Sequence, residues 1–536
     1  MNHVELFAGC GGLCLGLTKA GFKLTLANEL SPMAAETFAY NFFGEDLATH
    51  PEAAKRTRWI SSSFGRDAMT KRLREDPRSY PENGLHSDLD PDGANLEGGL
   101  VVGNILALNR WLEEHPVALE NLRNGFNGQG VDLVSGGPPC QSFSLAGLRE
   151  KNNEKNSLPW AFAKFVDLVR PKSVILENVT GILRPFTEGG IKYHAWFEVA
   201  KTFAMIGYVP LTLHVNAKYA GVAQHRPRFI LMAFREDVFE ALRPGLNEAE
   251  EALFESSGQF FKTVRAGGAT THKDLAVWDL NTNDETTWSL YRSSFLAPLA
   301  VRHGDYVSVQ EAIGDLEVET PHRPSSFVRN LNRTFNPLVA RAKDTDLTNR
   351  MIDNQPRVRR RFRIYQVMAQ PHVPQATRTM LSAFIAGKRD HISDEAWESL
   401  RNEEFLLETN DFARFQTKDA FEAYLREHLT KKQTQRALIG DDPAPAALSI
   451  PDDACHYKEL RTLSAREMAR IQSFPDGFKF RSKMTTGGSS RKFEVPIYTQ
   501  IGNAVPVLLG AALGQAMKAM LVRLQENLLT EERKAG

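Results

Sequence analysis

The sequence of 536 residues predicts an α/β protein with a doubly wound, mostly parallel sheet and a second, smaller domain. Short apolar runs alternate with helical patterns from the N-terminus to about residue 235, which is typical of such a sheet. A glycine-rich turn directly follows the first apolar run. After residue 235 the alternation stops, which indicates that a different domain begins there.

Composition excludes several classes of protein. Hydrophobic residues make up 42% and charged residues 24%, which is typical of a soluble globular chain. Four cysteines are too few for a disulfide framework, and neither Cys10 nor Cys14 has a second Cys/His pair at zinc spacing, so we expect no metal site. No apolar stretch is expected to reach membrane-spanning length, and no signal peptide is evident. The net charge of zero argues neither for nor against nucleic acid.

The first unit is a strand, a glycine turn and a helix. A strand beginning at His3 runs into the turn, and a helix follows over Leu13–Ala20. This arrangement lets backbone approach a ligand and points a helix N-terminus at it, but Cys14 replaces the third glycine of the dinucleotide fingerprint. The next strand, Lys23–Asn28, ends at Glu29. An acid there binds a ribose diol or simply begins the next helix, and both interpretations stay open.

The remaining strands of the first domain follow an irregular insertion at about 45–96, in which one helix is expected near Arg66–Glu75. Ligands bind beyond the carboxyl ends of the strands in such sheets, so the side chains that follow strand ends should line one crevice. The expected strands are Gly98–Val102, Val131–Ser135, Ser173–Leu176, Val209–Val215 and Phe229–Phe234, and the expected helices are Leu158–Val169 and Val199–Ile206.

A stiff turn presents one cysteine after the strand that ends at Ser135. Two glycines and two prolines, Gly136–Pro139, stop the strand and lead to Cys140, which polar side chains flank. A thiol held this way is suited to be a nucleophile. A small buried apolar residue is the other interpretation, because most free cysteines are that.

The region from 236 to 455 is strongly basic in one part. Eleven arginines and one lysine lie between Pro321 and Met380, against three aspartates. Arginine binds phosphates and base edges with two hydrogen bonds, so this bias favours a phosphate-facing surface over an ordinary solvated face. Beyond it, Ser464 and Glu467 form a capping box, and the stretch 500–506 opens an apolar helix to about Leu521.

Six segments in a fixed order resemble the DNA cytosine-5 methyltransferase family. They are Glu5–Gly16, Gly136–Ser144, Glu177–Val179, Gln224–Arg228, Arg461–Pro475 and Gln500–Pro506. The resemblance implies a Rossmann-like catalytic domain over 1–235, a target-recognition domain over 236–455, and a C-terminal part, 456–536, that returns to the catalytic domain. It also implies S-adenosylmethionine as cofactor and double-stranded DNA as partner.

The resemblance assigns chemical roles to four residues. Cys140 would add as a thiolate to C6 of cytosine, which needs an electropositive setting. Glu177 would share a proton with N3 of the ring, while Arg228, supported by Arg226, would bind O2. Because C5 and C6 cannot be reached inside a duplex, the base would be flipped out.

Further residues are assigned to the cofactor and to DNA. The cofactor set is Phe7, Gly9, Cys10, Gly11, Gly12, Glu29, Leu30, Asn104, Ile105, Pro139, Leu158, Asn503 and Ala504. The DNA set is Gln141, Ser144, Gln224, Arg357, Arg359, Arg360, Arg361 and Arg363. Three positions depart from the family pattern: Glu5 replaces an aspartate, Leu30 an adenine-stacking aromatic residue, and Asn104 an acid.

The first segment begins almost at Met1, so the resemblance favours the bacterial type: a cytoplasmic enzyme that is monomeric on DNA and works beside a restriction endonuclease or other defence proteins. Two alternatives remain open. One is a tRNA cytosine-5 methyltransferase on the same scaffold, against which the long arginine-rich region argues. The other is a catalytically inactive DNA-binding regulator, against which Cys140, Glu177 and Arg228 argue.

Overall fold

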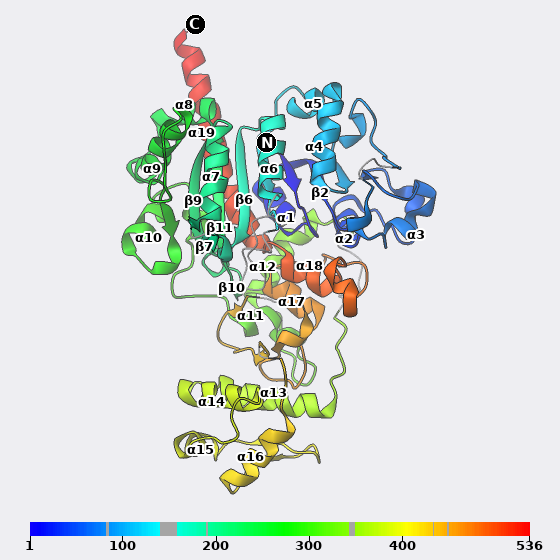
Figure 1. Ribbon diagram of the computed structural model, residues 1–536, viewed down its shortest axis with the longest axis vertical. Helices are drawn as coiled ribbons and strands as arrows, with labels where there is room; N and C mark the ends of the chain where they lie inside the picture. The colour runs from blue at the N-terminus through cyan, green and yellow to red at the C-terminus, as the bar shows by residue number, and fades with distance from the viewer. Residues whose placement is uncertain are drawn as a thin grey trace.

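The computed structural model describes residues 1–81, 85–139, 158–188, 191–341, 349–432, 434–446 and 450–535. Figure 1 shows an upper part, in which helices flank a large sheet, and a lower body built from α13 to α16. A group of shorter helices, including α11, α17 and α18, lies between the two. The predicted Cys140, Gln141 and Ser144 lie outside the described residues.

The central sheet has nine strands in the order β12-β9-β11-β6-β5-β1-β2-β4-β3. β11 is antiparallel to both of its neighbours, and the other neighbouring strands are parallel. The predicted doubly wound α/β sheet is therefore confirmed. Its strands are β1 (Asn2–Leu6), β2 (Lys23–Glu29), β3 (Thr57–Trp59), β4 (Gly99–Val102), β5 (Leu133–Gly136), β6 (Ser173–Val179), β9 (Tyr208–Asn216), β11 (Pro227–Arg235) and β12 (Val277–Asp279).

The helices of the upper part cover both faces of this sheet, as Figure 1 shows. Those at the N-terminal side are α1 (Gly12–Ala20), α2 (Pro32–Phe43), α3 (Met69–Arg72), α4 (Ile105–Glu114), α5 (Pro116–Arg123), α6 (Leu158–Val169) and α7 (Ala195–Met205). Three more follow the last predicted strand: α8 (Glu236–Leu242), α9 (Glu248–Arg265) and α10 (Glu285–Arg292). A small hairpin, β7 (Phe186–Glu188) with β8 (Ile191–Tyr193), precedes α7.

Residues 236–300 pack into the same hydrophobic core as the sheet. Phe254 of α9 and Trp288 of α10 are buried there with Phe234 of β11. β12 extends the sheet beyond β9. The start of a second domain at 236 stays a prediction. Residues 236–300 themselves pack against the sheet.

The insertion at about 45–96 is part of the fold. β3, which the sequence did not predict, pairs with β4 at the edge of the sheet. Arg72 of α3 is fully buried, forms two hydrogen bonds with Asp88 at 2.7 and 3.2 Å, and lies over the ring of Trp59. The described part of the insertion therefore packs onto the edge of the sheet.

The lower body has its own hydrophobic core, to which Phe362, Leu381 and Phe421 belong. Its helices are α13 (Pro356–Ala369), α14 (Gln375–Ile385), α15 (Asp394–Leu400) and α16 (Lys418–Glu427). Its short strand pairs are β13 (Phe405–Leu406) with β14 (Phe412–Ala413), and β15 (Arg436–Ala437) with β17 (Ala454–Cys455).

The intermediate group joins the lower body to the sheet. It contains α11 (Val309–Ile313), α12 (Ser326–Phe335), α17 (Ala465–Ile471), α18 (Ile497–Asn503) and the pair of β10 (Gln224–His225) with β16 (Ala444–Pro445). α17 begins with the predicted capping box of Ser464 and Glu467.

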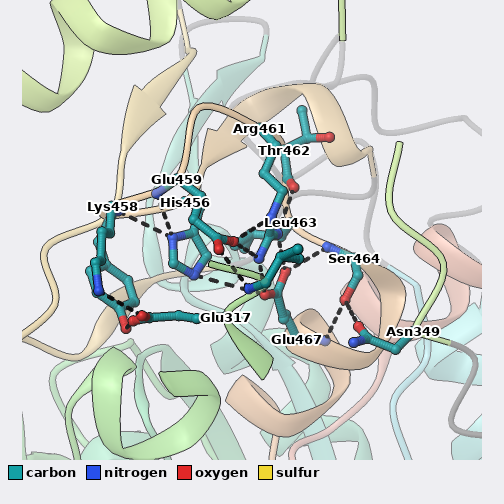
Figure 2. Close-up of polar contacts among 12 residues, drawn as sticks. Glu317, Asn349, His456, Lys458, Glu459, Arg461, Thr462, Leu463, Ser464 and Glu467 are labelled. Atoms are coloured by element: carbon teal, nitrogen blue, oxygen red, sulfur yellow. Dashed lines mark hydrogen bonds and ion pairs between the residues drawn. The ribbon is translucent and has the colours of Figure 1, made fainter. Parts of the chain in front are cut away.

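A buried polar network fixes this connection, as Figure 2 shows. Arg461 donates two hydrogen bonds to the fully buried carboxylate of Glu467, at 2.8 and 2.7 Å. The backbone carbonyl of His456 accepts a hydrogen bond from Gln366 of α13, and Lys458 donates to Glu317 at 2.8 Å. The chain entering α17 is thus bonded to the lower body and to the segment after α11.

The last helix, α19 (Val507–Ala535), is a core helix. The stretch 497–530 is long and apolar enough to cross a membrane by length and composition, so the prediction that no such stretch exists is wrong among the described residues. However, 67% of the most apolar part of this stretch is buried inside the protein. It packs along α1, where Gly510 lies against Leu13 and Gly16 lies against the α19 backbone.

Candidate active site

Two loops meet where the strand order of the sheet reverses. β1 lies between β2 and β5, so the loop after β1 and the loop after β5 leave the same edge on either side of this switch point. Ligands of open α/β sheets bind at such points. Phe7, directly after β1, has a left-handed backbone with φ of 55°, which is uncommon for a bulky residue and found at functional sites.

The glycine loop is bonded to the end of the second strand. The carboxylate of Glu29 accepts hydrogen bonds from the backbone N–H groups of Gly9 and Ser31, both at 2.8 Å. Burial raises the pKa of Glu29, although these N–H groups oppose the shift. Glu29 therefore joins the loop to the start of α2, and the two interpretations left open by the sequence are compatible.

A carboxylate and an arginine pair at the end of β6. Arg228 Nε lies 2.6 Å from Glu177 Oε1, and both side chains are mostly buried. The other oxygen, Oε2, would lie 2.8 Å from a Cβ placed on Gly137, so this carboxylate touches the turn that precedes Cys140. Burial lowers the pKa of Arg228, while the charge of Glu177 opposes that shift.

Asn178 lies in the segment Glu177–Val179, and its side chain holds the turn after β5. Its side-chain amide donates a hydrogen bond of 3.0 Å to the carbonyl of Pro138. The turn is thus held from β6 on two sides, by Glu177 and by Asn178. A polar residue directly after a strand-end acid was the sequence signal for this contact.

Arg226 is bonded to the C-terminal motif. Its Nη2 donates hydrogen bonds to the backbone carbonyls of Gly502 at 2.9 Å and Ala504 at 3.0 Å. Burial and the neighbouring Arg228 lower its pKa. This side chain fixes the segment that carries Asn503, whose own side chain is exposed.

The other predicted cofactor residues surround the same edge. Asn104 caps α4 through its amide oxygen, which accepts a hydrogen bond from Leu106 at 2.9 Å, and Leu30 is 39% exposed. The remaining members are partly or fully buried, apart from the exposed Pro139: Phe7, Gly9, Cys10, Gly11, Gly12, Ile105, Leu158 and Ala504. The thiol of Cys10 is buried and donates to the carbonyl of Gln500, with 3.7 Å between the sulfur and the oxygen. Burial raises the pKa of this thiol.

These residues fit a nucleoside with an amino-acid tail. Gly9 has a left-handed backbone, and a Cβ placed on it would meet nothing within 4 Å, so the space above the loop is open. Glu29 presents its acceptor beside that space. A diol can be bound by such a carboxylate, and a carboxylate-bearing tail by the helix N-terminus that follows the loop.

The sequence of the chain matches one family profile across most of its length. The profile of C-5 cytosine-specific DNA methylases matches residues 1–63 and 115–519. The chain belongs to this family. It is a DNA (cytosine-5-)-methyltransferase, as the order of its six segments implied. Residues 64–114, which include most of the insertion, lie outside the match.

The chain is similar to curated type II methyltransferases. The type II methyltransferase M.DdeI of Desulfomicrobium norvegicum is 24% identical, over 96% of this chain and 88% of its own length. M.AgeI of Thalassovita gelatinovora, also a type II methyltransferase, is 25% identical over 97% of this chain and all of its own (100%). A putative DNA modification methyltransferase encoded within a prophage of E. coli has a TM-score of 0.45 at 17% identity, covering 97% and 99% of the two chains.

The predicted DNA-contacting arginines of this methyltransferase divide into two groups. Arg357 and Arg359 of α13 are exposed. Arg360, Arg361 and Arg363 instead have partners inside the lower body, so these guanidinium groups are committed in this structure. The partners are His428 and Glu408 for Arg360, Gln435 for Arg361, and the carbonyl of Glu404 and the ring of Phe412 for Arg363.

Gln224 is fully buried rather than exposed toward a duplex. It lies on β10 beside a cavity of about 30 Å³ that Arg436 and Asp453 also line. Its amide has no hydrogen-bond partner within the described part of the chain. A direct contact of Gln224 with DNA stays a prediction, and it would need this junction to open.

A buried polar group beneath the glycine loop was not predicted. Polar atoms of His3, Glu5 and Cys14 all lie within 4.8 Å of one another, and all three side chains are buried. Burial lowers the pKa of His3 to about 3 and raises the pKa values of Glu5 and Cys14, so burial favours the uncharged form of each side chain. The expectation that the enzyme holds no metal stays a prediction.

Proposed function

We propose that this methyltransferase transfers a methyl group from S-adenosylmethionine to C5 of a flipped-out cytosine in duplex DNA, through a covalent bond between Cys140 and C6. The observation that carries the proposal is the position of Glu177. Its carboxylate pairs with Arg228 and touches Gly137, in the turn that leads to Cys140, across the switch point from the glycine loop.

Cytosine C5 is too weak a nucleophile to react unaided. Addition of the Cys140 thiolate to C6 forms an S–C bond and moves electron density onto N3 and O2 of the ring. Glu177 would share a proton with N3, and Arg228, which pairs with Glu177, would stabilise O2. Bound S-adenosylmethionine would supply an electrophilic methyl group to C5, and it would leave as S-adenosylhomocysteine when its sulfur–methyl bond breaks. Loss of the C5 proton to a base returns an electron pair to the ring and breaks the S–C bond.

The rest of the chain supports this chemistry. Glu29 would bind the ribose hydroxyls, with Phe7, Ile105 and Leu158 around the adenosine and Asn503 at the methionine end. The segment 236–455 would hold the target-recognition domain, of which α13 to α16 form the compact body. We further propose that the enzyme is cytoplasmic, acts as a monomer on DNA and protects it beside a restriction endonuclease or another defence protein.

Transfer of labelled methyl groups from S-adenosylmethionine tests this proposal. The wild type should label duplex DNA and not tRNA, and bisulfite sequencing should give one recognition sequence. Cys140→Ala should bind duplex DNA as the wild type does and transfer nothing. Labelling confined to tRNA would show the wrong substrate, while turnover by Cys140→Ala would remove the covalent step.

A further inference from the structure

The insertion reaches the cofactor edge of the sheet. β3 pairs with β4, and after it the N–H of Ile60 donates to the carbonyl of Val102 at 3.0 Å. Ile60 also lies directly against Gly103, where a Cβ would be 2.4 Å from its side chain. The N–H of Gly103 in turn donates to the carbonyl of Glu29 at 2.9 Å. The insertion therefore adjoins the predicted ribose acid and the loop that leads to Asn104.

The C-terminal part holds the insertion on its other side. Arg74 donates a hydrogen bond of 2.9 Å to Ser482, and the guanidinium of Arg78 lies 4.6 Å from the ring centre of Phe493. Both partners precede the closing motif that carries Asn503. The insertion thus bridges the adenosine side of the predicted cofactor site and the segment before its methionine side.

Within this bridge, the hydroxyl of Tyr80 is buried and donates to no acceptor in the described chain. Burial first, then the charges of Glu75 and Glu29, raise the pKa of Tyr80, whereas a hydrogen bond with the Trp59 indole lowers it. The hydroxyl is therefore within electrostatic range of the predicted ribose acid.

Both carboxylates near Tyr80 already accept other hydrogen bonds. Glu75 accepts from the hydroxyl of Ser62 and the N–H of Ser63, both at 2.7 Å, and Glu29 accepts from Gly9 and Ser31. The indole N–H of Trp59 can only donate. Neither carboxylate accepts from the Tyr80 O–H, which is a buried donor without an acceptor among the described residues, and leaving such a group unpaired is costly.

We propose that Tyr80 is a cofactor-binding residue whose hydroxyl donates a hydrogen bond to the adenosine moiety of S-adenosylmethionine, with the insertion forming one wall of the nucleoside site. Adenosine offers ribose oxygens and adenine nitrogens as acceptors. Leu30 stands where an aromatic residue often stacks on adenine in the family, and it is 39% exposed. The wall formed by the insertion would supply contact area with adenine that Leu30 does not. Tyr80 lies in the segment outside the family match, so this contact is specific to the insertion.

The inference rests on the proposed use of S-adenosylmethionine, and binding of S-adenosylhomocysteine by calorimetry tests it. Tyr80→Phe removes only the hydroxyl and should weaken binding about 3- to 10-fold, the size of one neutral hydrogen bond. 5′-Methylthioadenosine, which keeps the nucleoside and lacks the amino-acid tail, should lose the same factor. Tyr306→Phe is the matched control and should bind as the wild type does, because Tyr306 is half-buried beside Lys218, which follows β9 near the opposite end of the sheet from β3.

The outcomes separate the two proposals. If Tyr80→Phe and the wild type bind S-adenosylhomocysteine equally, Tyr80 does not contact the nucleoside and the inference is overturned. If only the homocysteine-bearing ligand loses affinity, the contact is at the tail and the inference is also overturned. If the wild type binds neither ligand, the proposed function itself fails.

Discussion

Glu29 and Glu177 occupy equivalent places, each near the carboxyl end of a strand, but their partners differ. Glu29 accepts backbone N–H groups from the glycine loop and from the start of α2. Glu177 is paired with a cation, Arg228, and touches the turn before Cys140. In the proposed mechanism, the first arrangement would orient an acceptor for the ribose hydroxyls, whereas the second would balance the charge that develops on the cytosine ring.

A residue could be predicted as part of the site where a motif defines its position, but not where only packing does. Glu177 and Arg228 could be predicted because a motif defines both positions. Tyr80 could not, because it lies in a segment without periodicity and outside the family match. Arg360 and Arg361 could not be separated from Arg357 and Arg359 either, since only packing decides which face of α13 is buried.

His3 should make the fold sensitive to mild acid. Burial lowers its pKa from about 6.5 in the unfolded chain to about 3, so protonation below pH 6.5 favours the unfolded state. Its contribution is complete above pH 6.5 and is lost progressively as the pH falls toward 3. At pH 5.5, one unit below the unfolded pKa, the loss is about 1.4 kcal/mol relative to neutral pH.

Denaturant unfolding of wild type and His3→Gln at pH 7.5 and 5.5 measures this difference. Glutamine does not titrate, so the variant should lose about 1.4 kcal/mol less than the wild type between the two pH values. Dialysis against EDTA beforehand should leave the result unchanged, because the effect comes from burial of the imidazole. Equal losses in the two proteins would show that His3 is not the acid-sensitive group.

At the scale of elements, strong periodicity gave reliable predictions and short segments did not. The helix predicted over Leu158–Val169 has those bounds in α6, and the capping box of α17 is present. The three-residue strands β3 and β12 were missed, because so few residues carry no pattern to read. Both owe their conformation to the sheet edge that they extend.

The contact between α1 and α19 allows a sharp test of packing. A Cβ on Gly16 would lie 2.4 Å from the backbone nitrogen of Ala511, where neither helix can yield cheaply. Gly16→Ala should therefore lower the melting temperature, with a cost of about 1–3 kcal/mol. Gly258, inside α9, is the matched control, since a Cβ there meets nothing within 4 Å.

For Gly258→Ala we expect the opposite sign, a gain of about 0.5–1 kcal/mol, because alanine is the better helix former. Both variants can be compared by thermal denaturation under one set of conditions. Destabilisation of similar size in both would mean that the α1–α19 contact is not specifically tight.

For the whole molecule, the sheet and the family could be predicted from the sequence because six segments keep their order. The packing of residues 236–300 against the sheet could not, since that stretch lacks the strand–helix alternation. The lower body has a hydrophobic core of its own, and the predicted bounds of the second domain stay a prediction. In Figure 1, α13 and α14 form the layer of this body that lies nearer the rest of the protein.

Arg357 and Arg359 are the exposed arginines of α13. We therefore predict that they bind DNA phosphates, because they can do so without breaking contacts inside the lower body. Each phosphate contact that they make would release counterions, so binding should weaken as salt rises. The double variant Arg357→Ala/Arg359→Ala should lower DNA affinity and reduce the slope of log K against log salt by about 2. Its affinity for S-adenosylhomocysteine should not change.

Fluorescence anisotropy with a labelled duplex at several salt concentrations measures this slope. Arg110→Ala is the matched control, because Arg110 is exposed on α4 in the upper part and should leave the slope unchanged. If the double variant keeps the wild-type slope, the arginine-rich helix is a solvated face and the duplex is bound elsewhere. A loss of affinity for the cofactor product as well would instead indicate unfolding, which a melting curve of the same sample distinguishes.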